Sequence, residues 1–428
     1  MLRSRGNPDN KALSPRRRVV VTGLGAITPV GLTAPESWEA FVAGRSGVGP
    51  VTQFDASPYP SRIAAEVKGF DPRNTMDGKE AKYIAARCSQ FTVVAAQEAL
   101  SDAGLNWPLT DGERAAVVLG TGLGGLELYN EGIRRMAKHN STRIHPMTAI
   151  GGLANMPAFH LSQRYGCEGP LNTVVTACAA GTQAVGEAME LIRRGAADLV
   201  LTGGVEALII DLFYAGFCAM RILSTRNDEP ERASRPFDAD RDGFIIGEGC
   251  AVLVLESLER AQARGARIYA EVLGQGASAD AHHIAAPHPE GAGAARAMRW
   301  ALADAGIEPT DVDYINAHGT ATELNDITET MAIKQVFGEH AHRLAISSTK
   351  SMIGHCFGGA GAIEALACVY SVYHNVIHPT INYETPDPAC DLDYVPNVAR
   401  QAQVNVAMSN SFGLGGQNAC LVVGKYGG

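Results

Sequence analysis

The sequence predicts a layered α/β protein made of two similar halves. Three stretches of the first half return in the same order in the second half. The paired stretches are 99–104 (ALSDAG) with 301–306 (ALADAG), 117–122 with 314–319, and 173–190 with 346–366. The apolar helices that begin within the last pair are expected to lie between two sheets, which gives alternating layers of helix and sheet.

Length and composition agree with this organisation. The 428 residues are too many for one ordinary core, and a chain that is 46% apolar and 19% charged is typical of a globular protein. We therefore predict a flexible N-terminal tail over residues 1–17, an N-terminal half over 18–265 and a C-terminal half over 266–428.

The elements of the N-terminal half follow from local patterns. Apolar and β-branched runs predict strands within 18–25 and 115–125, which end in a glycine turn and a glycine-rich loop, and at 173–176, 198–204 and 250–256. The run at 173–176 is expected to be buried. Helices are predicted at 34–43, 80–104, 184–195 and 257–265. Pro35 suits the first turn of its helix, while Gly195 and Gly265 suit helix ends. Between these elements, a surface excursion is predicted at 50–75 and an irregular, partly helical insertion at 126–170. Polar turns are predicted at 224–243.

Several classes of protein are disfavoured. The most apolar long run, 199–220, contains Glu206 and Asp211 and is predicted as strand, turn and core helix rather than a membrane span. The net charge of −9 argues against nucleic acid as the main partner. The nine cysteines include no C-x-x-C pair, which disfavours a disulfide framework and a zinc site and favours a reducing cytoplasm. The arginine-rich start has no hydrophobic signal region, although a short organelle-targeting segment is the alternative to a loose tail.

Cys178 stands where a predicted strand changes into a helix. Small residues around it, Ala177 and Ala179–Gly181, permit a sharp turn with room for a substrate. A thiol at the start of a helix faces unpaired N–H groups and the positive end of the helix dipole, so we expect the thiolate to be favoured. The alternative for a single cysteine is a small buried core residue.

Three further features are expected on loops that face the same cleft between the halves. They are His318 in NAHGT, Lys350 with His355 in SSTKSMIGH, and a glycine loop in SNSFGLGGQN at 409–418. Taken singly, each has an ordinary explanation: a satisfied structural histidine, a solvated lysine and a turn. Together with Cys178 they indicate an acyl-transfer site, in which the thiolate attacks a thioester, backbone N–H groups stabilise the oxyanion and two imidazoles stabilise an enolate.

These motifs resemble those of the β-ketoacyl-(acyl carrier protein) synthases of the thiolase superfamily, from about Arg18 to Val423. The motifs that carry the resemblance are TACAAG from 176, RPFD from 235, RDGFIIGEG from 241, NAHGT from 316, STKSMIGH from 348 and SNSFG from 409. Residues 278–291 make the chain more similar to the type II condensing enzyme than to type I. The resemblance implies a thiolase fold, with duplicated halves in a five-layer αβαβα arrangement.

The resemblance also implies a reaction. Cys178 takes an acyl chain from its carrier protein, and malonyl carrier then binds. His318 and His355 support decarboxylation and hold the enolate oxygen, which gives a β-ketoacyl carrier two carbons longer, as in fatty acid elongation. Lys350 supports the histidines, with Glu329 as its ionic partner, and the backbone N–H groups of Cys178 and Leu414 form the oxyanion hole. No organic cofactor or catalytic metal is implied.

The acyl pocket and the carrier surface are assigned by the same resemblance. Leu123, Phe217, Phe412 and Leu414 line or gate the pocket. Arg221, Lys79 and Lys82 are candidates for docking the acidic carrier, with plain solvated charges as the alternative for the two lysines. The family usually has FGFGGT where this chain has FGLGGQ at 412–417, so Leu414 replaces an aromatic gate. Ala285, Ala321 and Glu323 also depart from the family pattern, and none of them removes a catalytic group.

Other interpretations remain open at this point. A polyketide or specialised-lipid ketosynthase shares the same triad, and a non-catalytic chain-length partner shares the fold, although intact Cys178, His318 and His355 argue against it. A thiolase is disfavoured because its chemistry usually needs a second cysteine. The family implies a homodimer in the cytoplasm, without nucleic acid or membrane.

Overall fold

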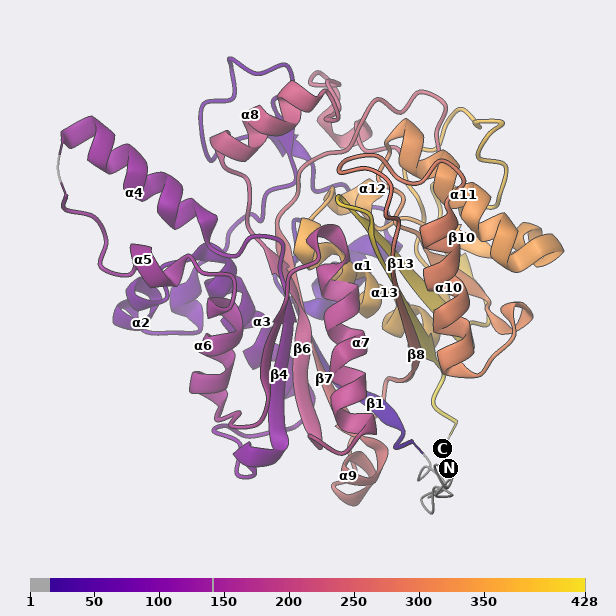
Figure 1. Ribbon diagram of the computed structural model, residues 1–428, viewed down its shortest axis with the longest axis horizontal. Coiled ribbons are helices and arrows are strands. Elements are labelled where there is room, and N and C mark those ends of the chain that lie inside the picture. The colour runs from indigo at the N-terminus through magenta and orange to yellow at the C-terminus, as the bar shows by residue number, and fades with distance from the viewer. Residues whose placement is uncertain (1–15, 141, 428) are drawn as a thin grey trace, which may run out of the picture.

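A computed structural model describes residues 16–140 and 142–427 (Figure 1). Residues 1–15 of the flexible tail expected at 1–17 therefore lie outside the described residues. Ten strands form one mixed sheet in the order β10-β9-β13-β14-β8-β1-β7-β6-β4-β5. In the described part of the chain no helix is long and apolar enough to cross a membrane.

The ten strands divide into two sets of five with the same topology. The first set is β1 (Val19–Ile27), β4 (Ala115–Gly120), β5 (Leu171–Val174), β6 (Leu199–Glu206) and β7 (Gly249–Ser257). The second set is β8 (Ala270–Ala279), β9 (Tyr314–Asn316), β10 (Ala345–Ser347), β13 (Val406–Gly413) and β14 (Gln417–Gly424). In each set the spatial order is third, second, fourth, fifth, first, the first two pairings are parallel and the last two antiparallel. Among the described residues, strand pairing between the two sets is limited to Val20 with Glu271 and Val21 with Ala270.

Helices cover both sets of strands and fill the space between them. They are α1 (Ala34–Val42), α2 (Gly78–Tyr83), α3 (Arg87–Asp102), α4 (Leu126–His139), α5 (Thr148–Gly151), α6 (Met156–Tyr165), α7 (Ala180–Arg193), α8 (Asp211–Met220), α9 (Leu258–Ala263), α10 (Ala292–Ala305), α11 (Glu323–Phe337), α12 (Lys350–Ile353) and α13 (Ala360–His374). Short strands β2 (Gly49–Pro50), β3 (Ile63–Ala64), β11 (Val376–Ile377) and β12 (Arg400–Gln401) pair outside the large sheet.

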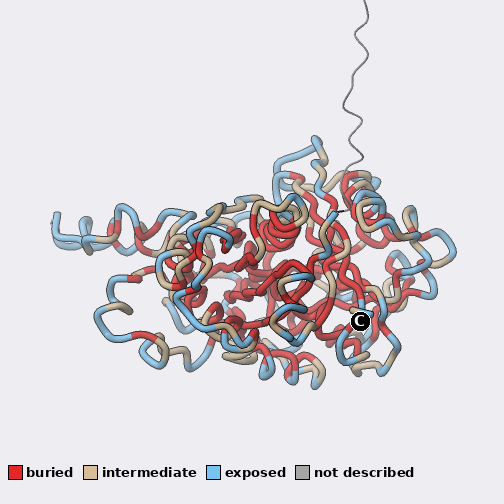
Figure 2. Tube along the Cα trace, turned by 90° about the horizontal axis from the view of Figure 1, so that it is seen from below, coloured by how far each residue is buried: buried red, intermediate tan, exposed pale blue. Residues whose placement is uncertain are grey.

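Three apolar clusters define the layers. The central cluster joins α7 and α13 to strands of both sets, for example Ala188 and Leu366 with Leu421. An outer cluster packs α3 and α6 on the first set, and another packs α10 and α11 on the second set. Side chains alternate between clusters along β14, where Leu421 faces the centre and Val422 the outside, as strand geometry requires. Figure 2 shows the buried residues gathered in this interior. The five-layer arrangement with duplicated halves is confirmed.

Two local predictions are wrong. The helix expected at 80–104 is interrupted at 84–86, because Ile84 and Ala86 turn into the outer core between α2 and α3. The strand expected to be buried at 173–176 is β5, which lies at the edge of the sheet with exposed Leu171 and partly exposed Val174. A β-branched run favours a strand but does not distinguish a central strand from an edge strand. The domain boundary that we place at 265–266 stays a prediction.

Candidate active site

Cys178 lies in a tight turn between β5 and α7. Ala177 adopts φ +50°, a left-handed conformation that is unusual for alanine, and α7 begins at Ala180. Close packing requires the small residues that follow, because a Cβ atom at Gly181 would lie 2.7 Å from the backbone nitrogen of Ala362 on α13. The turn therefore presents the thiol at the junction of the two halves, where it is 4% exposed.

The Cys178 thiol is neutral at rest. Burial raises its pKa to about 11, although the Leu414 backbone N–H and the Lys350 ammonium both act to lower it. The expectation that the helix start favours the thiolate is therefore wrong. Desolvation penalises the charged form more than the helix end and the nearby positive charge favour it.

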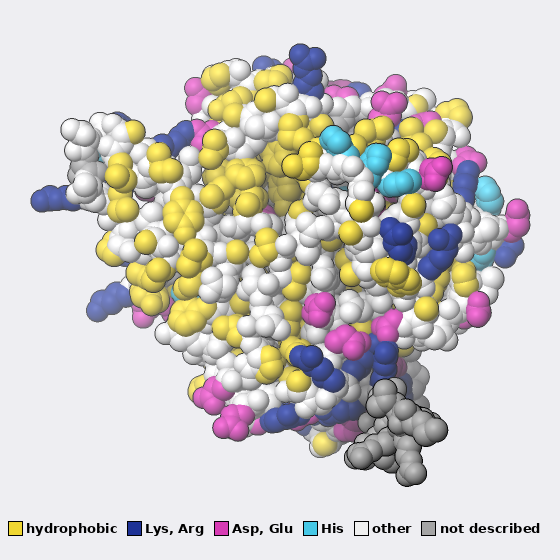
Figure 3. Space-filling model, viewed as in Figure 1, with side chains coloured by type: hydrophobic (Ala, Val, Ile, Leu, Met, Phe, Trp, Pro, Cys, Tyr) yellow, Lys and Arg dark blue, Asp and Glu magenta, His cyan; other side chains and the backbone are white. Residues whose placement is uncertain are grey.

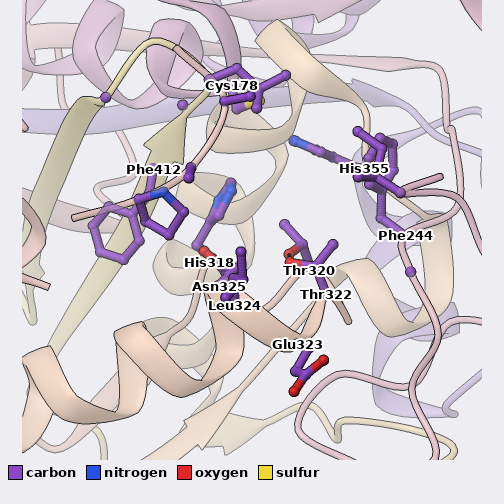
Figure 4. Close-up of a pocket in the computed structure, with 18 of the residues that line it drawn as sticks. Cys178, Phe244, His318, Thr320, Thr322, Glu323, Leu324, Asn325, His355 and Phe412 are labelled. Carbon is purple, nitrogen blue, oxygen red and sulfur yellow. Dashed lines mark hydrogen bonds between the residues drawn. The ribbon is translucent and has the colours of Figure 1, made fainter. Parts of the chain in front are cut away.

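His318 and His355 lie on loops of the second half and point toward the same space as Cys178 (Figure 4). His318 comes two residues after the end of β9, and His355 comes two residues after the end of α12. The backbone of His355 is fixed, since its N–H donates to Ile245 (2.7 Å) and its carbonyl accepts from Gly247 (2.9 Å). The two imidazole rings lie edge to face with centroids 5.4 Å apart.

Lys350 is buried and contacts two partners. Its Nζ forms an ion pair with Glu364 of α13 and donates to Nδ1 of His318 at 3.3 Å. Glu364 was missed by the sequence reasoning, although a single acid inside the apolar helix Ala360–His374 was a signal for it.

Glu329 has a different role from the one expected, so its assignment as the ionic partner of Lys350 is corrected. Its carboxylate accepts the backbone N–H groups of His318 and Gly319, both at 2.8 Å, and the Asn410 side chain at 3.3 Å. Burial raises its pKa to about 7. Glu329 therefore holds the backbone of the His318 loop.

Both catalytic-site histidines are neutral. Burial and the Lys350 charge hold the pKa of His318 and of His355 well below the ordinary value, and His355 adds to the effect on His318. The Lys350 ammonium can only donate hydrogen bonds, so His318 Nδ1 must be the acceptor of the hydrogen bond between them. The neutral His318 ring therefore carries its proton on Nε2 and can donate it as a hydrogen bond.

A cavity of about 340 Å³ opens beside these groups and is lined by Cys178, His318, His355, Phe412 and Leu414. Leu414 is 37% exposed at the rim, where Arg221 also lies. Other predicted residues lie elsewhere. Phe217 packs in the apolar cluster behind the cavity, Leu123 follows β4 outside its lining, and Lys79 and Lys82 lie on α2.

Few groups near the site suit a bound ion. Among the described residues there is no cluster of three or more His, Cys, Asp or Glu side chains that could hold a metal. Two buried oxygens, Asn316 Oδ1 and Ser409 Oγ, have no hydrogen-bond partner and stand at paired positions of β9 and β13.

The raised thiol pKa predicts a steep pH dependence. Only the thiolate is alkylated, so the rate with iodoacetamide is expected to rise about tenfold per pH unit from about pH 7 to about pH 10. The rate is measured by the intact mass of the protein, with a Cys178→Ala variant to subtract the other cysteines. A rate that levels off below about pH 9 contradicts the desolvated thiol.

Comparison with known protein families shows to which family this chain belongs. A family model for the N-terminal domain of β-ketoacyl synthases matches residues 16–261, and a model for the C-terminal domain of these synthases matches residues 269–384. The chain belongs to the β-ketoacyl synthase family.

Curated relatives of this β-ketoacyl synthase extend over nearly its whole length. A protein of Synechocystis sp. is 50% identical over 411 residues, which cover 96% of this chain and 99% of the relative. A protein of Coxiella burnetii is 46% identical over 410 residues, with the same coverage. Both are named 3-oxoacyl-[acyl-carrier-protein] synthase 2, which confirms the resemblance to the type II enzyme.

Solved structures agree with the fold. The ishigamide ketosynthase/chain length factor superposes with a TM-score of 0.90 at 39% identity, covering 96% of this chain and 100% of that one. A type II polyketide ketosynthase bound to its acyl carrier protein gives a TM-score of 0.88 at 37% identity, with the same coverage.

Proposed function

We propose that this β-ketoacyl synthase performs a decarboxylating Claisen condensation between an acyl group on Cys178 and malonyl carrier protein, in fatty acid elongation. The observation that carries the proposal is the convergence of one thiol and two neutral imidazoles on one open cavity. A nucleophile and two hydrogen-bond donors are what successive acyl transfer and enolate formation require.

The first half-reaction loads the enzyme. The Cys178 sulfur attacks the thioester carbonyl, the bond from the carbonyl carbon to the carrier sulfur breaks, and the thiol proton ends on the released carrier thiol. Support for an oxyanion hole comes from the Leu414 and Cys178 backbone N–H groups, which lie close enough to the sulfur to lower its pKa. Because the resting thiol is neutral, its proton has to leave as the carbon–sulfur bond forms.

The second half-reaction forms the carbon–carbon bond. Malonyl carrier loses carbon dioxide, and the electron pair of the broken bond becomes an enolate whose oxygen accepts hydrogen bonds from His318 and His355. The enolate carbon attacks the acyl-enzyme carbonyl and displaces the Cys178 sulfur as a thiolate, which takes up a proton to restore the neutral thiol. A neutral donor suits this step, since the proton on His318 Nε2 is held in place by Lys350 on the opposite nitrogen.

The loading and discharge of Cys178 test the proposal. The intact mass of the protein is measured after incubation with acyl carriers of increasing length and again after malonyl carrier is added. We expect an adduct that a Cys178→Ala variant lacks and that malonyl carrier discharges as a β-ketoacyl product. A folded protein that forms no adduct with any primer overturns the catalytic assignment and favours a non-catalytic partner subunit.

A polyketide ketosynthase is the second candidate, because the solved structures at 37–39% identity include a type II polyketide ketosynthase. Fatty acid elongation is preferred because the relatives at 46–50% identity are named 3-oxoacyl-[acyl-carrier-protein] synthase 2. The two differ in product. Reduced acyl primers extended once per cycle indicate fatty acid elongation, whereas repeated extension of an unreduced β-ketoacyl chain indicates polyketide synthesis.

The carrier protein is proposed to dock at the mouth of the cavity. Arg221 lines this rim, at the end of α8 in a left-handed conformation with φ +56°. Its exposed guanidinium fits an acidic carrier surface. Lys79 and Lys82 on α2 do not line the cavity, so their assignment to the carrier surface depends on a larger footprint.

A homodimer is proposed to form through the edge strand β5. Leu171 is 43% exposed and Val175, directly after β5, is 52% exposed. Figure 3 shows apolar side chains gathered on the side of the molecule where α4, α5 and α6 lie in Figure 1. Other exposed apolar residues of the first half are Leu123, Ile150, Leu153 and Leu212. An exposed apolar edge strand is normally covered, and a second copy presents a complementary edge.

Val175→Glu is expected to weaken the dimer. Two glutamates brought into an apolar interface face desolvation and like-charge repulsion. Sedimentation velocity is expected to show a dimer for the unaltered protein and a shift toward monomer for the variant. Val398→Glu is the matched control, because Val398 is 74% exposed on the loop before β12. A monomeric unaltered protein, or a variant that remains fully dimeric, contradicts the interface.

The location in the cytoplasm stays a proposal. It is supported by the nine cysteines, each of which keeps a free thiol in the structure. Eight of these thiols are buried and Cys218 is partly exposed. Such a set of unpaired thiols is typical of a reducing compartment.

A further inference from the structure

Phe357 is held in an unusual backbone conformation beside the active site. Its φ is +43°, in the left-handed region that bulky side chains rarely occupy. The chain is fixed on both sides of it. The His355 N–H is bonded to Ile245, and Gly358 packs so tightly that a Cβ atom there would lie 2.3 Å from the Gly122 nitrogen. Strain of this kind persists where the surroundings enforce it, and it is concentrated at functional sites.

The Phe357 ring is packed between two other rings. It stacks on the His355 imidazole, with centroids 4.9 Å apart and planes at 24°. On its other side it stacks on Phe217, with centroids 5.3 Å apart and planes at 17°. Phe244 meets its edge at 6.0 Å. Rotation of the ring would break both stacked contacts, so the ring is held in one position.

Phe357 forms part of the cavity wall beside Cys178. Phe357 and Phe244 line the cavity together with Cys178, whereas Phe217 does not line it. All four residues belong to one buried apolar cluster, so the space behind Phe357 is occupied by packed side chains rather than by an open channel. An acyl chain bound to Cys178 therefore meets the face of an aromatic ring.

We propose that Phe357 closes the acyl pocket and restricts Cys178 to short linear acyl groups. The proposal rests on the proposed function, because it assigns the class of acyl group that the same thiol accepts. A smaller residue at 357 would open a path toward Phe217 and α8, where a longer chain could lie. Phe357 is thus a specificity-determining residue, and Leu414, which also lines the cavity, is a separate feature.

The test measures pocket length without needing condensation. Iodoacetamide and its N-butyl, N-octyl and N-dodecyl derivatives alkylate Cys178, with sulfur displacing iodide, and intact mass gives the rate for each. For the unaltered protein the rate is expected to fall sharply between the shorter and longer probes. In Phe357→Leu the ratio of the N-dodecyl rate to the iodoacetamide rate is expected to rise by about tenfold or more. Acyl carriers of matching lengths are expected to give the same order.

Two further variants keep the result interpretable. Phe357→Gly adopts φ +43° without strain, so it supplies a second measurement if leucine does not fold. Phe54→Leu is the matched control, because Phe54 packs on Tyr214 beside the same cluster and does not line the cavity. The control is expected to keep the length profile of the unaltered protein.

The outcomes separate the two proposals. Equal length profiles in the unaltered protein and both Phe357 variants overturn the assignment of Phe357, as does rapid N-dodecyl alkylation of the unaltered protein. A changed alkylation profile together with no acyl transfer from any carrier supports the pocket closure and contradicts the proposed condensation. A changed profile with matching acyl-carrier lengths supports both.

Discussion

Replacing His318 by alanine is expected to leave Cys178 able to take up an acyl group and to slow carbon–carbon bond formation by roughly 10²–10³-fold. His318 is neutral and donates from Nε2, so its loss removes a donor to the enolate oxygen. The thioester exchange at Cys178 uses the backbone N–H groups and keeps them. Intact mass measures the loading, and release of labelled carbon dioxide from malonyl carrier measures the second step.

His160→Gln is the matched control for this change. His160 is also a buried histidine, but it lies on α6 against Tyr83 and Phe159 and does not line the cavity. Its variant is expected to load and condense as the unaltered protein does. If His318→Ala loses loading and carbon dioxide release to the same degree, His318 acts before the enolate forms and its proposed role is wrong.

The main features of the fold and site could be predicted because they depend on short-range patterns. The repeated strand and helix signals give two halves with the same strand order. The motif residues Cys178 and His318 follow strand ends, and His355 lies between two helices that come after a strand. When two such halves face each other, these ends meet at one cleft. The thiol, the two imidazoles and the glycine loop at 413–416 are therefore placed together by the order of the elements alone.

Other features depend on contacts between distant segments. Glu364 was visible as an acid in an apolar helix, but its partner Lys350 is set by how α13 packs against α12 and β13. β5 is exposed because it is the last strand of the sheet, and its position in the sheet cannot be predicted from a local sequence pattern. The raised pKa of Cys178 arises from its burial, which outweighs the effect of the helix start that was predicted from the sequence. The left-handed φ of Phe357 is imposed by contacts of the residues on either side of it with distant segments, and no local sequence pattern indicates those contacts.

The Lys350–Glu364 pair gives the largest expected effect on stability. Both side chains are almost completely buried, and Ser411 Oγ is 3.5 Å from the second carboxylate oxygen. Glu364→Ala leaves an ammonium group in the core without its counter-ion, so the free energy of unfolding is expected to fall by about 3–5 kcal/mol. Glu364→Gln keeps an oxygen for Lys350 and is expected to lose less. Urea unfolding followed by circular dichroism measures both.

A double variant distinguishes stability from catalysis at this pair. Lys350→Met with Glu364→Leu replaces two buried charges by apolar groups of similar size, so most of the stability lost in Glu364→Ala is expected to return. Condensation is not expected to return, because His318 Nδ1 no longer accepts a proton donor and the ring is free to place its proton on that nitrogen. Acyl loading of Cys178 is expected to persist. If the double variant condenses as fast as the unaltered protein, the pair stabilises the core and does not set the protonation of His318.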